Sequence, residues 1–227
     1  MKKVLGILAV AVFSVVVAGN AFAYTAVNEV LESQDGFEWI ESPYWTVTDL
    51  TTGSDGSIYN LLIDEEAAFE SNFGIFSKND ASNVFEIFNA KEEPLGMKSV
   101  YFKNEADDWF VSFDDKDEES WQAFDDEFGF YYDVYRGGAD DCTVDYTFYT
   151  DSSLNTMDAD IQHIGMEWNG TDNAHFYLED KLEGEADWDW NDMTVAVHDI
   201  EPVPEPGTML LLGVGLLGLL GLKRTRG

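Results

Sequence analysis

The chain has 227 residues and a formal net charge of −33, because 45 acidic residues stand against only 12 basic ones. A surface of this charge repels phosphate backbones, which excludes a nucleic-acid-binding protein, so no nucleic acid is expected among the partners. Aromatic residues make up 15% of the chain, which argues against a disordered acidic protein, and the single cysteine, Cys142, excludes an intramolecular disulfide.

Residues 1–23 have the three-part pattern of a secretory signal peptide. A short basic stretch precedes an apolar run over residues 4–18, and Ala21 and Ala23 supply small side chains at positions −3 and −1 of a signal peptidase site. We therefore expect signal peptidase to cleave before Tyr24 during export. A permanent membrane helix is the alternative, but the apolar run is shorter than the ~20 residues that a span needs.

Residues 24–200 are expected to form one extracellular domain, since about 180 residues suffice for a hydrophobic core. Apolar and polar residues alternate with a period of two in several segments, which indicates half-buried β-strands. These segments are residues 109–113, 128–135, 142–149 and 193–198. Glycine-containing turn signals separate the segments, which predicts an all-β, mainly antiparallel fold, namely a β-sandwich or jelly-roll-like single domain. The best candidate for a helix is short and covers residues 65–70.

One acidic segment near the end of this domain has oxygen side chains at the spacing of a calcium-binding loop. Asp187, Asp189 and Asn191 follow an i, i+2, i+4 pattern, with Asp192 beside them and Asp180 upstream. Ca²⁺ takes six to eight oxygen ligands, so these five residues are the expected metal ligands and Ca²⁺ is the cofactor that suits them. The segment is not an EF-hand, because it lacks the Gly and the final Glu of that motif. The alternative is an acidic hairpin turn whose oxygens bond to the local backbone.

Catalytic motifs are absent from the sequence, and we expect the protein not to be an enzyme. There is no G-x-S-x-G elbow and no H-E-x-x-H zinc motif, and no local pattern links Cys142 to any of the three histidines. Carboxylate pairs suited to glycoside hydrolysis can be drawn from any strongly acidic chain, so their presence carries no weight. Two alternatives stay open: a carbohydrate-binding module that uses Trp, Tyr and Ca²⁺, and, less favoured, a polysaccharide hydrolase.

Residues 201–227 combine a proline-rich motif, an apolar segment and a basic end. Pro204, Glu205 and Pro206 form the motif, residues 208–222 are apolar, small or Thr, and residues 223–227 form a basic tail. The apolar segment predicts a short transmembrane helix of roughly 22 Å, with its basic end on the cytoplasmic side. An ordinary tail anchor is the alternative, although a tail anchor would not need a signal peptide.

This arrangement closely resembles the PEP-CTERM sorting signal of Gram-negative bacteria. In that family an exosortase, which is a membrane transpeptidase, recognises the motif and removes the helix. The resemblance implies an exported protein that is anchored transiently in the inner membrane and then reaches the cell surface or the extracellular matrix. It implies exosortase and exopolysaccharide as partners, and a biofilm as the setting in which we expect a non-enzymatic role.

A second resemblance covers the acidic segment. Residues 175–180 and 187–192 resemble the end of a domain of unknown function that is common in bacterial surface proteins and closes in a D-x-D-[FYW]-N-D signature. Residues 72–76 and 128–131 are similar to upstream parts of the same domain. This resemblance implies a β-rich extracellular module, with cation binding as one expected property, and it says almost nothing about an activity.

Overall fold

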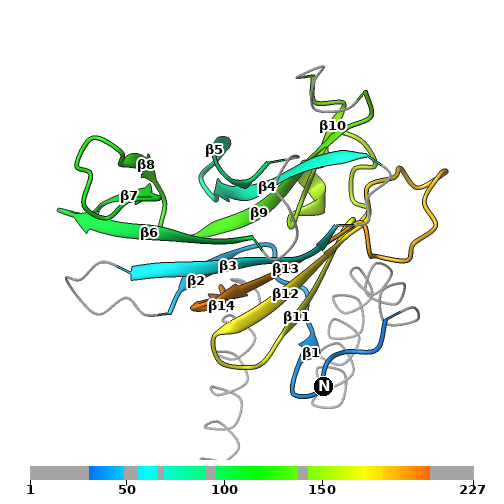
Figure 1. The fold of residues 1–227 in the computed structure, drawn as a ribbon, viewed down its shortest axis with the longest axis horizontal. Coiled ribbons are helices and arrows are strands. Elements are labelled where there is room, and N and C mark those ends of the chain that lie inside the picture. Colours follow the sequence, from blue (N-terminus) through cyan, green and yellow to red (C-terminus); the bar gives the residue numbers. More distant parts are fainter. Residues whose placement is uncertain (1–30, 49–55, 66–68, 90–95, 138–142, 205–227) are drawn as a thin grey trace, which may run out of the picture.

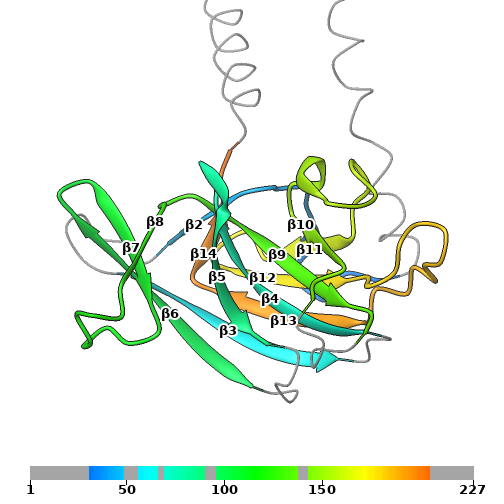
Figure 2. The same cartoon turned by 90° about the horizontal axis from the view of Figure 1, so that it is seen from above.

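Two antiparallel β-sheets form the body of the protein (Figure 1). The computed structural model describes residues 31–48, 56–65, 69–89, 96–137 and 143–204. The two sheets lie one above the other in Figure 1, and β4 and β9 of one sheet overlap β12 and β13 of the other when seen from above (Figure 2). The predicted all-β, antiparallel sandwich is therefore confirmed.

The larger sheet has eight strands, and each strand pairs with its neighbour in antiparallel register. Their order across the sheet is β1 (Glu38–Trp39), β11 (Ile164–Trp168), β12 (Asn173–Leu178), β13 (Met193–His198), β3 (Gly56–Glu65), β6 (Met97–Glu105), β7 (Asp108–Ser112) and β8 (Gln122–Phe124). Strands β11, β12 and β13 form a meander, and this part of the sheet carries the acidic segment.

The smaller sheet has six strands. Its order is β14 (Ile200–Pro202), β2 (Trp45–Val47), β9 (Phe128–Tyr135), β4 (Glu70–Ser77) and β5 (Asp80–Phe88), with β10 (Tyr146–Tyr149) also paired to β9. A 3₁₀ turn at Ser152–Leu154 follows β10 and is the only helical element among the described residues. The predicted strands at residues 128–135 and 193–198 coincide with β9 and β13.

Aromatic side chains from both sheets meet in the core. Phe130 on β9 stacks on Phe73 of β4 at 5.5 Å between ring centroids, and it reaches across to Phe176 on β12 at 4.3 Å. All three rings are fully buried. Burial of one such side chain stabilises the fold by roughly 1.5–3 kcal/mol, so these contacts hold the two sheets together.

Two local predictions differ from the structure. The helix expected over residues 65–70 is wrong, because Glu65 ends β3 and Glu70 begins β4, while residues 66–68 lie outside the described part of the chain. The strand expected over residues 142–149 begins only at Tyr146, and residues 143–145 adopt no regular structure. Just before the strand, the N–H of Asp145 still donates a hydrogen bond of 2.9 Å to the carbonyl oxygen of Val134 on β9, and Cys142 lies outside the described residues.

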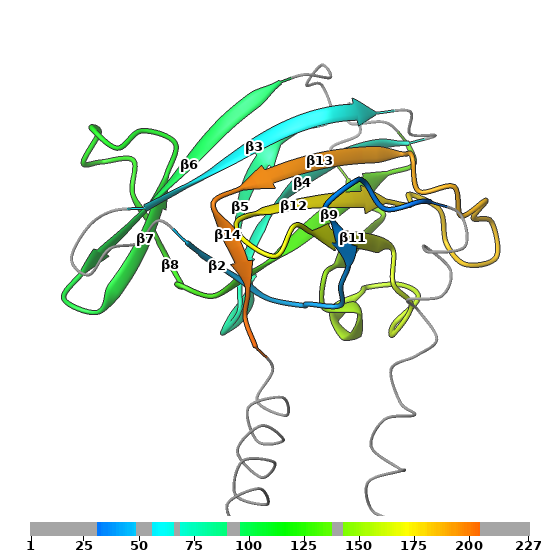
Figure 3. The same cartoon turned by 90° about the horizontal axis from the view of Figure 1, so that it is seen from below.

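The folded domain continues past residue 200. Strand β14 pairs with β2, so that Ile200 lies opposite Val47 and Pro202 opposite Trp45 (Figure 3). Ile200 is fully buried, and the N–H group of Val203 donates a hydrogen bond to the carbonyl oxygen of Tyr44. The sequence up to Val203 is therefore part of the sandwich and not of a free linker.

The predicted signal peptide and the predicted apolar segment at residues 208–222 lie outside the described residues. Among the residues that are described, none belongs to a helix of the length and apolar character that crossing a membrane requires.

Candidate functional site

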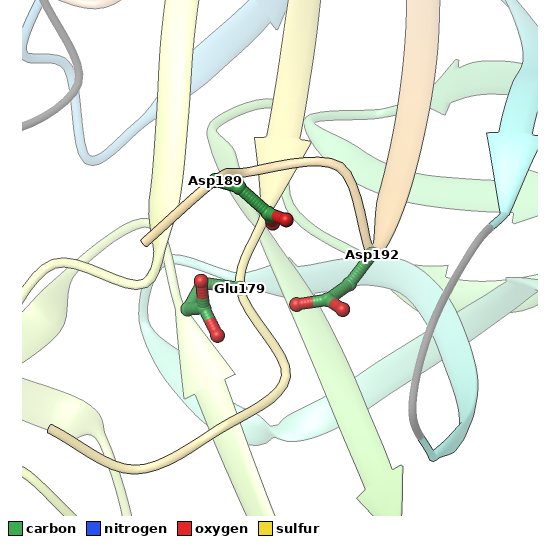
Figure 4. Close-up of side chains that lie close together, drawn as sticks. All are labelled: Glu179, Asp189 and Asp192. Atoms are coloured by element: carbon green, nitrogen blue, oxygen red, sulfur yellow. The ribbon is translucent and has the colours of Figure 1, made fainter. Parts of the chain in front are cut away.

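Three carboxylates gather where β12 and β13 are connected. Figure 1 shows this connection at one end of the sandwich. Leu178 and Met193 form the last residue pair of these two strands. Glu179 and Asp192 are the next residues on either side, so the strand geometry sets them close to each other. The connection between them folds back, and its residue Asp189 completes the group (Figure 4).

The three side chains present their oxygens to one another. Each of Glu179, Asp189 and Asp192 offers one carboxylate oxygen, and these atoms all lie within 4.8 Å of one another. Glu179 is fully buried, Asp192 is 3% exposed, and Asp189 is partly exposed. The group is thus a shielded cluster with one side open to solvent at Asp189.

Hydrogen bonds satisfy only some of these oxygens. Asp192 Oδ2 accepts the N–H of Asp180 at 2.7 Å, and Glu179 Oε1 accepts the N–H of Lys181 at 3.3 Å. Asp189 Oδ1 accepts a long bond of 3.4 Å from the N–H of Asn191. The second oxygen of Glu179, Oε2, is buried and has no hydrogen-bond partner among the described residues.

Burial and mutual repulsion make full ionisation of the cluster unfavourable. Burial raises the pKa of Glu179 to about 7, and the negative charge of Asp192 adds to this shift. Burial also raises the pKa of Asp192 to about 6, with repulsion from Asp180 and Asp189 acting in the same direction and the N–H of Asp180 opposing it. The charge of Lys181 opposes both shifts but does not cancel them, so the positive charge near the cluster does not balance its burial and repulsion.

Aromatic packing fixes the connection that carries Asp189. Its two neighbours, Trp188 and Trp190, have backbone φ angles of 54° and 58°, a left-handed conformation that bulky residues rarely adopt. Trp190 is buried, and Trp188 packs against His163 at 5.2 Å between ring centroids. His163 in turn stacks on Phe148 at 3.8 Å. Such a conformation persists only where its surroundings impose it, so the packing sets the position of Asp189.

The predicted ligands separate into two groups. Asp189 and Asp192 lie in the cluster, whereas Asp187 is exposed and its Oδ1 accepts a hydrogen bond from Lys181 Nζ at 2.8 Å. Asn191 is also exposed. Asp180 is buried beside the cluster, and its Oδ2 accepts the N–H of Phe69 at 2.7 Å.

Glu179 was not among the predicted ligands. Its place in the cluster follows from the pairing of Leu178 with Met193, and that pairing is not visible in the spacing of acidic residues. An alignment of β12 and β13 as a hairpin with a long connection would have pointed to Glu179, because Glu179 and Asp192 flank the last residue pair of the two strands.

The residues predicted for processing lie at the edges of the described structure. Ala21, Ala23 and Tyr24 at the signal peptidase site, and Glu205 and Pro206 of the sorting motif, are outside it. Pro204, the first residue of the motif, is described and exposed, and it follows Val203 directly.

Comparison with known proteins identifies the end of the chain. Residues 202–224 match the PEP-CTERM protein-sorting motif. The chain therefore carries a C-terminal sorting signal, which implies export and processing by an exosortase. No curated protein and no solved structure matches the chain. The resemblance of residues 175–192 to a domain of unknown function stays a prediction.

Proposed function

We propose that this protein is a non-enzymatic component of the cell surface or extracellular matrix, that it associates with exopolysaccharide in a biofilm, and that it binds Ca²⁺. In this proposal signal peptidase and exosortase process its two ends, and the inner membrane holds it only until the second cleavage. The β-sandwich is then the part that reaches the outside.

The observation that carries the proposal is the junction between the sandwich and the sorting motif. The N–H of Val203 donates a backbone hydrogen bond to Tyr44 within the fold, and the next residue is Pro204, the first of the motif. A transpeptidase that acts at this motif would release a folded domain with almost no residual tail. This arrangement fits a protein whose whole folded part is the exported product.

The burial of His163 supports a non-enzymatic role, although His175 and His198 are partly exposed. His163 is fully buried between Phe148 and Trp188, and burial lowers its pKa to about 4. His175 Nδ1 lies 2.9 Å from Oε1 of Glu167, a fully buried carboxylate. General acid–base catalysis needs a side chain that reaches a substrate, and a buried imidazole cannot.

The strong acidity of the protein supports a role for divalent cations in its association with the matrix. A protein of this charge repels acidic polysaccharides, and a divalent cation shared between carboxylates would relieve the repulsion. We therefore expect the protein to leave the matrix fraction when EGTA removes Ca²⁺. Release by added NaCl alone, with no effect of EGTA at constant ionic strength, would contradict this part of the proposal.

The sorting part is tested by Glu205→Ala in the native host, followed by fractionation and mass spectrometry of both termini. The wild-type protein should appear at the surface with Tyr24 as its first residue and without residues 208–222. Glu205→Ala should leave full-length protein in the inner membrane. Glu201→Ala, an exposed change in β14 four residues upstream, is the matched control and should be processed normally. An unchanged surface form of Glu205→Ala would overturn the proposal.

A further inference from the structure

We propose that Glu179, Asp189 and Asp192 bind one divalent cation at the connection between β12 and β13 (Figure 4). This inference rests on the calcium-binding part of the proposed function and assigns it a site. It adds Glu179 to the expected ligands and leaves out Asp180, Asp187 and Asn191.

The spacing of the oxygens suits one ion. Oxygen ligands lie 2.3–2.6 Å from Ca²⁺, so two ligands on opposite sides of the ion are about 5 Å apart. The three carboxylate oxygens lie within 4.8 Å of one another. A single cation between them can therefore contact all three without a rearrangement of the backbone.

A second, independent observation is the buried oxygen Oε2 of Glu179. Glu179 is fully buried, and this oxygen has no hydrogen-bond partner among the described residues. The side chain faces Asp189 and Asp192, which offer further acceptors and no donor (Figure 4). A buried carboxylate oxygen without a hydrogen-bond donor is costly, and a bound cation removes that cost.

The nearby lysine offsets the negative charge of the cluster only in part, because its ammonium group is paired with a carboxylate outside the cluster. Lys181 follows Glu179 by two residues, but its Nζ donates to Asp187 Oδ1 at 2.8 Å. Lys181 holds the pKa of Asp187 below its usual range through this bond. Lys181 and Asp187 thus form an ion pair beside the cluster, and in this proposal Asp187 is a partner of Lys181 and not a metal ligand.

The donor atoms select the class of cation. The cluster contains only carboxylate oxygens, which suit hard ions such as Ca²⁺ and Mg²⁺ and offer no nitrogen or sulfur for zinc. The oxygens come from two strand ends and a long connection, and Ca²⁺ tolerates such irregular geometry better than Mg²⁺. We therefore assign Ca²⁺, with water completing the coordination at the partly exposed Asp189.

The test is calorimetric titration of the full chain in detergent with CaCl₂ or MgCl₂ at ~150 mM NaCl, after removal of metal with EGTA. The wild type should bind one Ca²⁺ per chain, and Mg²⁺ at least tenfold more weakly. Glu179→Gln should weaken Ca²⁺ binding by at least tenfold. Asp187→Asn removes the same charge from the same connection and should leave the affinity unchanged.

Thermal melting separates a lost site from a lost fold. In EGTA, Glu179→Gln should melt at or above the wild-type temperature, because it relieves repulsion, yet it should lose the upward shift that Ca²⁺ gives the wild type. Asp189→Asn provides a second variant with the same expected loss. Equal loss of the Ca²⁺ shift in Glu179→Gln and Asp187→Asn, or equal shifts with Mg²⁺ and Ca²⁺, would overturn the site. Sorting of Glu205→Ala is read separately, so this failure is distinguishable from failure of the proposed function.

Discussion

The backbone N–H of Val203 donates a hydrogen bond of 2.9 Å to the carbonyl oxygen of Tyr44, and the sorting motif begins at the next residue. This bond extends the pairing of β14 with β2, and Ile200 at the start of β14 is fully buried. The residues just before the motif therefore contribute to the stability of the domain. An exosortase must consequently act next to a folded surface.

The first prediction compares a fragment of residues 24–204 with one of residues 24–199. The shorter fragment lacks β14, so it loses the burial of Ile200, worth roughly 1.5–3 kcal/mol, and the bonds to β2. It should unfold at a clearly lower urea concentration, or not fold at all. A fragment of residues 24–203 is the control and should match the longer one. Equal unfolding midpoints for all three fragments would show that β14 adds nothing to the fold.

The second prediction concerns Gly74, which lies opposite Tyr131 in the pairing of β4 with β9. A Cβ atom at Gly74 would lie 2.4 Å from the carbonyl oxygen of Phe85 and 2.6 Å from the ring of Tyr131. Because one of these atoms is backbone, the strands themselves would have to shift. Gly74→Ala should destabilise the domain by about 1–3 kcal/mol in urea denaturation. Gly184→Ala is the control, since a Cβ there meets nothing within 4 Å, and it should leave stability almost unchanged.

The third prediction concerns Glu167, a fully buried carboxylate that holds the N-terminal segment on the sheet. Its oxygens accept hydrogen bonds from the N–H of Gln34 (3.1 Å) and from Tyr177 (2.8 Å), besides the contact with His175. Burial acts to raise the pKa of Glu167, but the bonds from His175, Tyr177 and Gln34 outweigh it and lower the pKa. Stability from this group is thus present above its unfolded pKa of about 4.5 and is lost as the pH falls through the folded value.

Glu167→Gln puts an amide where the N-terminal segment needs an acceptor, so it should cost about 1–3 kcal/mol at pH 7. It should also speed proteolytic cleavage within residues 31–37, which the wild-type carboxylate holds in place. Glu32→Gln, at an exposed position in the same segment, is the control. Unchanged cleavage in Glu167→Gln would mean that strand β1 alone fixes the segment.

Much of the fold could be predicted from the alternation of residues. The period of two in β9 and β13 is visible in the sequence, although β9 is buried on both faces over residues 128–132 and β13 over residues 195–197. Strand β14 was not predicted, because it has three residues, includes Pro202 and lies in a proline-rich stretch typical of a linker. Its burial depends on β2, which is far away in the sequence.

The candidate site could be predicted only in part, for a local reason. Residues at i, i+2 and i+4 share one side only where the backbone is regularly extended. The left-handed conformations of Trp188 and Trp190 break this regularity, so Asp187 and Asn191 are exposed while Asp189 joins the cluster. The tertiary packing of the two tryptophans produces those conformations, and this packing cannot be predicted from the spacing of acidic residues in the sequence.

The last prediction concerns His163 in acid. Burial lowers the pKa of His163 to about 4, with the charge of Asp158 opposing the shift, whereas an unfolded histidine has a pKa near 6.5. Above pH 6.5 the ring is neutral in the folded and the unfolded state, so its titration does not change the free energy of unfolding. Between pH 6.5 and 4 the imidazole of His163 is protonated in the unfolded chain but stays neutral in the folded protein. The free energy of unfolding should therefore fall over this range, by about 2 kcal/mol at pH 5.

His163→Phe keeps a ring on Phe148 but removes the titrating group, so its stability should not carry this loss. Glu179 and Asp192 act in the opposite direction, because their pKa values are raised and they lose stability as the pH rises toward about 7 and 6. Wild type and variant share those two groups. The measurement is therefore the difference between their urea unfolding free energies, in EGTA, at pH 7.5, 6 and 5.

Relative to the wild type, the unfolding free energy of His163→Phe should rise by about 2 kcal/mol between pH 7.5 and pH 5. His198→Phe, at a partly exposed position of β13, controls for the loss of an imidazole elsewhere and should not reproduce this gain. Any constant cost of fitting the larger ring on Phe148 cancels, because it is the same at every pH. If the wild-type and His163→Phe curves stay parallel across the range, the folded protein takes up the proton on His163, and the ring is less well shielded than its stacking implies.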